Sequence, residues 1–216
     1  MDSLPATPRW LQNFGGPLAR WWLREEVRGR QHVPATGPVI LAARHASHLD
    51  TVAVAAASPR RLTFLGSVKL AEQPIFGNVL QSLGMLVVNR GSADTDAMER
   101  VLEVLDRGGA VVIYPEGGRT RDGRVYRPRS GVARLASTAE CPVVPVGIHG
   151  TGEAWPIDER PRVWRRHDVR VAFGPPLDPP DDDPGSRRKF ASALHDELVE
   201  LSGAPRANGF NPKTSA

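Results

Sequence analysis

The chain has 216 residues, a length that suits one α/β domain with a buried core and requires no second domain. Its single cysteine, Cys141, excludes an intramolecular disulfide framework and a four-cysteine zinc site. A formal charge of only +4, two tyrosines and the lack of a recognisable nucleic-acid module make nucleic acid the weakest candidate partner.

The first predicted elements are two short amphipathic helices between residues 10 and 24. Their apolar face consists of Trp10, Phe14, Leu18, Trp21, Trp22 and Leu23. The segment Gly15-Gly16-Pro17 interrupts this face, and arginines flank it. Aromatic residues beside arginines suit the headgroup boundary of a membrane, and no apolar run of the chain is long enough to span one. Because amphipathic helices also pack on a protein's own core, both interpretations stay open.

Six apolar segments are predicted to be strands, at residues 39–44, 61–67, 85–90, 110–114, 142–148 and 169–174. Helices are predicted between or after them, at 50–58, at 75–83, from Ser92 or Asp94 to Gly108, at 131–139 and at 187–201. Strands that are apolar throughout and alternate with helices favour a mostly parallel sheet covered by helices on both faces. The predicted fold class is therefore α/β, a single domain preceded by the two N-terminal helices. Ligands of such sheets bind beyond the carboxyl ends of the strands.

The segment HASHLD, residues 45–50, directly follows the first of these strands. A His and an Asp five residues apart occur by chance too often for the spacing alone to identify a site. One interpretation makes His45 a general base that Asp50 orients, because neutral imidazole has a pKa near the working pH. Another makes His45, His48 and Asp50 metal ligands, with water as the nucleophile.

The segment YPEGGR, residues 114–119, ends another predicted strand. Pro115 fixes the chain as it leaves the strand, and the two glycines allow the backbone to approach a ligand. Glu116 supplies a hydrogen-bond acceptor, and Arg119 supplies a guanidinium fork that matches a phosphate. Six arginines lie between residues 119 and 134, and five lie between residues 160 and 170. These clusters suit anionic lipid or a phosphorylated substrate.

Together these segments resemble the glycerophospholipid acyltransferases of the 1-acylglycerol-3-phosphate acyltransferase type. Four blocks match that family in its order: HASHLD as the H-x4-D motif, then LGMLVVNR, YPEGGR as the P-E-G-x-R motif, and CPVVPVGI. The resemblance covers roughly residues 28–177. Arg44 replaces the usual Asn, Gly118 the usual Thr or Ser, and Tyr114 the more frequent Phe. On an extended strand, Arg44 is expected to point away from His45.

The resemblance implies transfer of a fatty acyl group from acyl-CoA or acyl carrier protein to the free hydroxyl of lysophosphatidic acid, which gives phosphatidic acid. It implies that His45 is the base and Asp50 its partner, with no acyl-enzyme, no metal and no cofactor. The implied substrate-binding residues are Arg90, Glu116, Gly117, Arg119 and Lys69. The two arginines are expected to hold the phosphate of the acceptor, and the glutamate its glycerol portion.

The chain is accordingly expected to comprise membrane-associating helices at 1–27, an acyltransferase domain at 28–202 and a disordered polar tail at 203–216. The first residues show no signal peptide, so we expect a cytoplasmic protein held peripherally on the anionic inner face of the cell membrane. Three other functions stay open. They are a metal-dependent hydrolase that uses HASHLD, an acyltransferase for another lysolipid acceptor, and an arginine-rich module that binds membrane or nucleic acid without catalysis.

Overall fold

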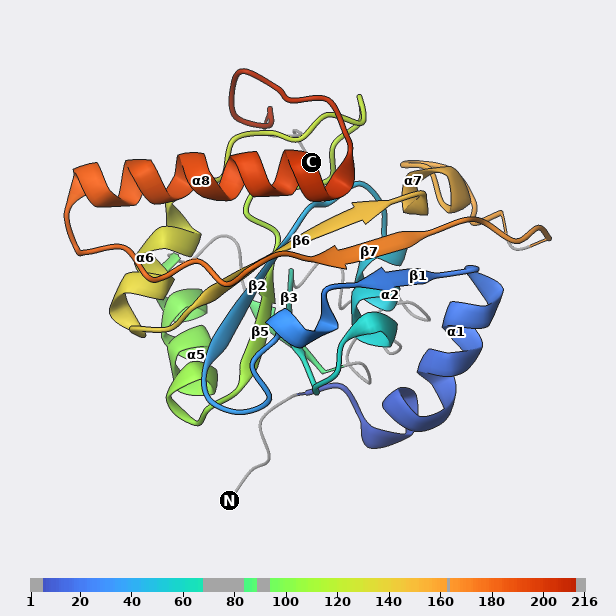
Figure 1. The fold of residues 1–216 in the computed structure, drawn as a ribbon, viewed down its shortest axis with the longest axis horizontal. Coiled ribbons are helices and arrows are strands. Elements are labelled where there is room, and N and C mark those ends of the chain that lie inside the picture. Colours follow the sequence, from blue (N-terminus) through green and yellow to red (C-terminus); the bar gives the residue numbers. More distant parts are fainter. Residues whose placement is uncertain (1–5, 68–83, 89–93, 163, 213–216) are drawn as a thin grey trace.

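In the computed structural model, which describes residues 6–67, 84–88, 94–162 and 164–212, the chain forms a seven-stranded sheet (Figure 1). The strands are β1 (Glu26–Arg28), β2 (Val39–Ala43), β3 (Thr63–Ser67), β4 (Met85–Val88), β5 (Ala110–Ile113), β6 (Val143–His149) and β7 (Arg170–Phe173). Their order is β1-β7-β6-β2-β5-β3-β4. Within these described strands, only the β6–β7 pair is antiparallel. The predicted single α/β domain with a mostly parallel sheet is confirmed.

Helices cover both faces of this sheet (Figure 1). One face carries the π-helical turn η1 (Leu11–Gly15), α1 (Gly16–Trp22), α2 (Leu49–Ala57) and α7 (Thr151–Ala154), and the other carries α5 (Asp94–Asp106), α6 (Ser130–Thr138) and α8 (Pro184–Ser202). A short 3-10 turn, η2 (Arg30–His32), follows β1. Because strand side chains alternate, Leu41 of β2 packs toward α2, and its neighbour Ile40 packs toward α5 and α8.

The long helix α8 shows why these residues form a helix between fixed ends. The carboxylate of Asp183 accepts hydrogen bonds from the first free amides of the helix, and Pro184 occupies the first helical position, where an N–H is not needed. Gly203 ends the helix in the left-handed conformation, at φ 64°. Phe190, Leu194 and Leu198 line its buried face. The helix is therefore longer at both ends than the predicted 187–201.

Two short elements, β1 and α7, were not predicted from the sequence. The three residues of β1 include one apolar side chain, Val27, which is too few to show a period, and the strand forms because its backbone pairs with β7. It crosses the expected domain boundary between residues 27 and 28. The predicted helix at 75–83 lies outside the described residues, as do the last two residues of the predicted strand at 85–90.

The N-terminal helices are amphipathic as predicted, but their apolar residues divide between the core and the surface. Leu23 is fully buried, and Trp22 packs against the same core cluster. Trp10, Phe14, Leu18 and Trp21 are exposed. No helix within the described part of the chain is both long enough and apolar enough to cross a bilayer.

The C-terminal segment differs from the expected disordered tail over its described part, residues 203–212. The amide of Val125 donates to the carbonyl of Pro205, Ala207 donates back to Val125, and Arg127 donates to Gly209. The loop after β5 has main-chain groups without partners in the sheet, and the C-terminal segment satisfies them. Figure 1 shows the two segments side by side above α8. Residues 213–216 lie outside the described residues.

Candidate active site

The carboxyl ends of three parallel strands bring the candidate residues together. His45 follows β2, Glu116 follows β5, and Thr151 follows β6. These strands are neighbours in the order β6-β2-β5, so residues that are separated by up to 106 positions meet at one edge of the sheet. The backbone amide of His45 donates to Glu116, and the hydroxyl of Thr151 donates to Asp50, so these residues form one hydrogen-bonded cluster.

His45 and Asp50 form a hydrogen-bonded pair, with 2.8 Å between Nδ1 of the imidazole and Oδ2 of the carboxylate. The carboxylate only accepts, so Nδ1 carries the proton and Nε2 carries the lone pair of the neutral ring. The His45 side chain is 16% exposed, whereas that of Asp50 is fully buried. His45 is therefore a partly accessible base, and its hydrogen bond to the buried Asp50 fixes its tautomer.

The backbone of the turn and a distant threonine hold Asp50 in place. Its Oδ2 also accepts hydrogen bonds from the amides of Ala46 (2.7 Å) and Ser47 (2.8 Å). The hydroxyl of Thr151, at the start of α7, donates to Oδ1 at 2.5 Å. Four donors thus stabilise the negative charge of a buried carboxylate, which would be costly to bury without them.

Thr151 was not identified from the sequence. It lies 101 residues from Asp50, so no local spacing connects the two. Its one available signal was its position just beyond the end of the strand at 142–148.

Tyr114 supports the imidazole from its face. The two rings are stacked, with centroids 3.9 Å apart and an interplanar angle of 16°. The phenolic oxygen lies 3.0 Å from Oγ1 of Thr51 on α2. Burial and the nearby carboxylate of Asp50 raise the pKa of this phenol, so it stays neutral. Tyr114 therefore fixes the plane of the His45 ring, while Asp50 fixes its rotation.

Glu116 is fully buried and stabilises the backbone of the site through two hydrogen bonds. Its Oε1 accepts from the backbone amide of His45 at 3.0 Å, and its Oε2 accepts from that of Tyr126 at 2.8 Å. Burial raises the pKa of this carboxyl to about 7, although the two hydrogen bonds and the charge of Arg44 lower it. The side chain that the resemblance assigned to the acceptor's glycerol portion is therefore engaged inside the protein. It connects the loop after β2 to the loop after β5.

Arg119 lies on the loop after β5, next to the His–Asp pair. The amide of the next residue, Thr120, donates to the carbonyl of His45 at 2.9 Å. The guanidinium is half-buried, and burial lowers its pKa while the carboxylates of Asp158 and Asp50 raise it. It borders a pocket of about 240 Å³ that is lined by Arg119, Arg121, Asp122, Tyr126, Asn211 and Pro212. This pocket carries the side chains of two arginines, on the loop that is hydrogen-bonded to the backbone of His45.

Gly117, the other predicted residue of this loop, has a left-handed backbone with φ 82°. A Cβ atom there would lie 2.4 Å from Nε of Arg129, so the position accepts only glycine without rearrangement. With glycine at this position, Arg129 can lie close to the loop, and its Nε donates a hydrogen bond to the carbonyl of Glu116. Gly117 therefore makes room for a structural arginine.

Arg44 is buried, and main-chain carbonyls hold its guanidinium. Its Nη1 donates to the carbonyl of Ile148 at 2.9 Å, and its Nη2 donates to that of Gly123 at 2.6 Å. The residue therefore joins the end of β6 to the arginine-rich loop. The positive charge of Arg44 also acts on the site electrostatically, because it lowers the pKa of Glu116.

His48 faces the ring of Trp155, with centroids 5.2 Å apart. Burial, helped by the nearby positive charge of Arg119, lowers the pKa of His48 to about 4, so the ring is neutral at working pH. The carboxylate of Asp50 is already saturated by four donors and is not free to ligate a metal with His45 and His48. Among the residues that the structure describes, no three His, Cys, Asp or Glu side chains group as a metal site.

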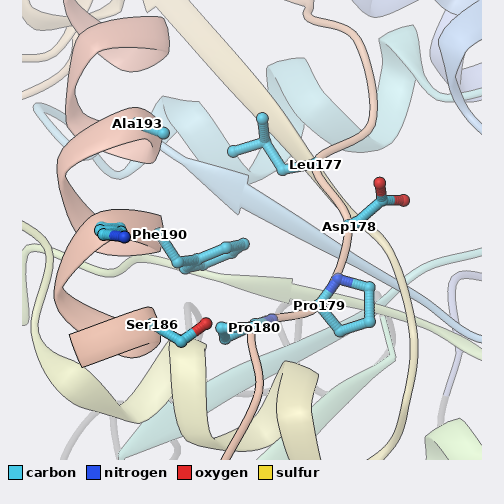
Figure 2. A pocket seen from close by; sticks show the side chains of 8 residues that line it. Leu177, Asp178, Pro179, Pro180, Ser186, Phe190 and Ala193 are labelled. Atoms are coloured by element: carbon cyan, nitrogen blue, oxygen red, sulfur yellow. The ribbon is translucent and has the colours of Figure 1, made fainter. Parts of the chain in front are cut away.

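Lys69 and Arg90, two of the predicted substrate-binding residues, lie outside the described residues. A larger hollow of about 320 Å³ is found elsewhere, between α8 and the loop after β7 (Figure 2). It is lined by Leu177, Asp178, Pro179, Pro180, Ser186, Lys189, Phe190 and Ala193. Leu177 bridges to Val143 at the beginning of β6, so this hollow lies at the opposite edge of the sheet from His45. It is not part of the candidate site.

The fold and the site together define an α/β protein with a hydrogen-bonded His–Asp pair at the carboxyl ends of its strands, next to the loop that carries Arg119. The chain belongs to the acyltransferase family, whose model matches residues 24–149, more than half of its length. This membership confirms the resemblance that the four sequence blocks indicated.

Three curated relatives show the range of the family around this chain. The 1-acyl-sn-glycerol-3-phosphate acyltransferase BAT2, chloroplastic, of Brassica napus is 24% identical over 180 residues, which are 78% of this chain and 52% of that protein. The alpha enzyme of the same name from Bos taurus is 26% identical and covers 87% of this chain and 67% of its own. The lyso-ornithine lipid O-acyltransferase of Pseudomonas aeruginosa is 32% identical over 61% of this chain and 53% of its own. The chain spans about half the length of the first curated relatives it matches.

A solved structure shares the fold. The crystal structure of the 1-acyl-sn-glycerophosphate acyltransferase PlsC from Thermotoga maritima matches with a TM-score of 0.68 at 23% identity. The match covers 88% of this chain and 78% of that one.

Proposed function

We propose that this protein transfers a fatty acyl group from acyl-CoA or acyl carrier protein to the free hydroxyl of lysophosphatidic acid, which gives phosphatidic acid. The observation that carries the proposal is the 2.8 Å hydrogen bond between His45 and the buried Asp50, because it leaves Nε2 of a partly exposed imidazole as a base beside the loop that carries Arg119. The names of several relatives, which are 1-acyl-sn-glycerol-3-phosphate acyltransferases, support the same activity.

The proposed step needs no group beyond those of the site and the two substrates. The acceptor hydroxyl gives its proton to Nε2 of His45 as its oxygen attacks the carbonyl carbon of the thioester. The C–S bond then breaks, the acyl group remains on the acceptor oxygen as an ester, and the leaving thiolate takes the proton from the imidazolium. Asp50 stabilises the positive ring between these two events.

Arg119 is the proposed ligand of the acceptor's phosphate, together with Arg90. A guanidinium pairs with a phosphate through parallel N–H donors, and the pocket beside Arg119 adds a second arginine, Arg121. Arg121 forms a salt bridge with Asp158 at 2.7 Å, which partly neutralises its charge. The charge of Asp158 also acts on the Arg119 guanidinium, but only together with the charges of Arg121 and Asp50. We therefore assign the larger share of phosphate binding to Arg119.

A second acceptor is supported by one specific relative. The Pseudomonas aeruginosa protein, at 32% identity, is named for lyso-ornithine lipid, so we keep acylation of a lysolipid without a terminal phosphate as the alternative. The test is an acceptor panel of lysophosphatidic acid, glycerol-3-phosphate, lyso-ornithine lipid and lysophosphatidylcholine, each with acyl-CoA and with acyl carrier protein. Preference for lysophosphatidic acid supports the proposal, and preference for lyso-ornithine lipid replaces it.

We also propose that the protein works peripherally on the anionic inner face of the membrane, on the cytoplasmic side. Trp10, Phe14, Leu18 and Trp21 expose their side chains on the N-terminal helices, and Trp164 is 74% exposed in the β6–β7 connection. The guanidinium of Arg166 lies 4.7 Å from the ring centroid of Trp21, so the second arginine cluster adjoins this aromatic face. Aromatic side chains beside arginines suit the headgroup layer, where each basic residue contributes about 1 kcal/mol.

Co-sedimentation with anionic vesicles tests this contact. The double variant Phe14→Ser/Trp21→Ser changes only exposed side chains, so it is expected to fold normally and to sediment much less than wild type. Phe210→Ser is the matched control, since Phe210 is 54% exposed on the C-terminal segment. If the control loses binding and the double variant keeps it, the membrane face lies at the arginines of residues 119–134 instead.

A further inference from the structure

The C-terminal segment, residues 205–212, is attached along the arginine-rich loop that borders the candidate site. Three main-chain hydrogen bonds join residues 205–209 to residues 125–127. Beyond them, Nη2 of Arg129 donates to the carbonyl of Asn211 at 2.9 Å. The ring of Phe210 lies 5.9 Å from the guanidinium carbons of both Arg127 and Arg129. The segment therefore has a defined position against this loop.

Asn211 reaches from this segment to the backbone of the site loop. Its amide nitrogen donates to the carbonyl of Gly118 at 2.9 Å and lies 3.4 Å from that of Arg119. It lines the same pocket as the Arg119 side chain. Gly117 and Gly118 are adjacent, and glycine has more backbone conformational freedom than any other residue. The hydrogen bonds from Asn211 therefore restrict the backbone where it is intrinsically least restricted.

Gly118 is also a position at which this sequence departs from the family pattern, which has Thr or Ser there. A Cβ atom at Gly118 would have the Asn211 amide nitrogen, 3.8 Å away, as its nearest neighbour. In this chain the amide of Asn211 thus occupies the space beside the missing side chain. The opposite side of the loop is held by the hydrogen bond from Thr120 to the carbonyl of His45.

We infer that Asn211 is a positioning residue that clamps the Gly118–Arg119 backbone and thereby determines how well the site binds an acceptor with a phosphate group. The effect on the acceptor rests on the proposed function, whereas the clamp itself does not. His45 is fixed by Asp50 and Tyr114, so loss of the clamp raises the KM for such an acceptor and leaves kcat nearly unchanged.

Hydrogen exchange tests the clamp without any substrate. In Asn211→Ala, and in Asn211→Asp, which keeps the shape but removes the donor, the amides of residues 117–121 are expected to exchange about tenfold faster, as for the loss of one hydrogen bond. Asn208→Ala and Asn208→Asp are the matched controls, because Asn208 is an exposed asparagine of the same segment. Unchanged exchange of residues 117–121 in both Asn211 variants would overturn the inference, whatever the protein's substrate.

Kinetics with two acceptors tests the consequence. For Asn211→Ala we expect the KM for lysophosphatidic acid to rise about tenfold, with little change for a lysolipid that has no terminal phosphate. Adding Gly118→Thr to Asn211→Ala should recover most of this loss, since a side chain fills the vacated space and restricts the backbone. Equal changes for both acceptors, or a fall in kcat with unchanged KM, would overturn the positioning role. If wild type acylates neither acceptor, the proposed function fails, and the exchange experiment still decides the clamp.

Discussion

Replacing Asp50 by Asn separates the charge of this carboxylate from its shape. The Oδ2 atom faces three donors, the ring of His45 and the amides of Ala46 and Ser47. The two backbone amides can only donate, whereas the hydroxyl of Thr151 can rotate and accept. The new amide therefore places its oxygen toward His45 and its nitrogen toward Thr151. The variant keeps the hydrogen-bonded geometry and the tautomer of the imidazole, and it loses only the negative charge.

The size of the effect follows from this geometry. A hydrogen bond to a charged group is worth about 1.5–3 kcal/mol, and one between neutral groups about 0.5–1.5 kcal/mol. The difference of roughly 1–2 kcal/mol is a 5- to 30-fold loss of rate, because about 1.36 kcal/mol corresponds to a factor of ten. Removal of the base in His45→Ala is expected to cost more, about 10²- to 10⁴-fold.

Release of free thiol from acyl-CoA measures both variants, with circular dichroism as the check on folding. Wild-type turnover in folded Asp50→Asn would show that the charge of Asp50 has no role in the reaction. A loss as large as that of His45→Ala would show that the amide has turned and reversed the tautomer, which would refute the assignment of Thr151 as the rotating partner.

Three further predictions concern the metal, the phosphate and the pH dependence. A strong chelator is expected to leave acyl transfer unchanged, and loss of activity that zinc restores would favour the metal-dependent hydrolase. Arg119→Ala, like Arg90→Ala, should weaken use of lysophosphatidic acid by roughly 2–3 kcal/mol in kcat/KM but spare an acceptor without the phosphate, and equal losses on both would make these arginines structural. Burial raises the pKa of Glu25 to about 8, and both of its carboxylate oxygens are buried without a hydrogen bond, so the stability of the native protein should fall as pH rises from about 4.5 to about 8. Glu25→Gln should therefore raise the melting temperature at pH 9 and leave it nearly unchanged at pH 4, and the opposite order would contradict the assignment.

The fold class and the central part of the site were determined by local sequence. The residues of β2 are apolar at every position, and this pattern is typical of a strand that is buried on both faces. His45 and Asp50 are five positions apart in a turn that leads into α2, so the chain itself brings them within hydrogen-bond distance. The same holds for the loop of residues 114–119, whose glycines and proline indicated a tight turn at the end of a strand.

The partners of these residues were decided by tertiary structure alone. Thr151 meets Asp50 because β6 and β2 are neighbours in the sheet, and pairing between strands distant in sequence leaves no periodic signal in either strand. The polar segment near the C-terminus has the composition of a tail, yet unpaired main-chain groups of the loop after β5 bind it and bring Asn211 to Gly118. Side-chain patterns report which face of an element is buried, whereas main-chain hydrogen bonds between distant segments are nearly independent of side-chain identity. The sequence therefore indicated the candidate catalytic residues, and only the folded chain determined which residues hold them in place.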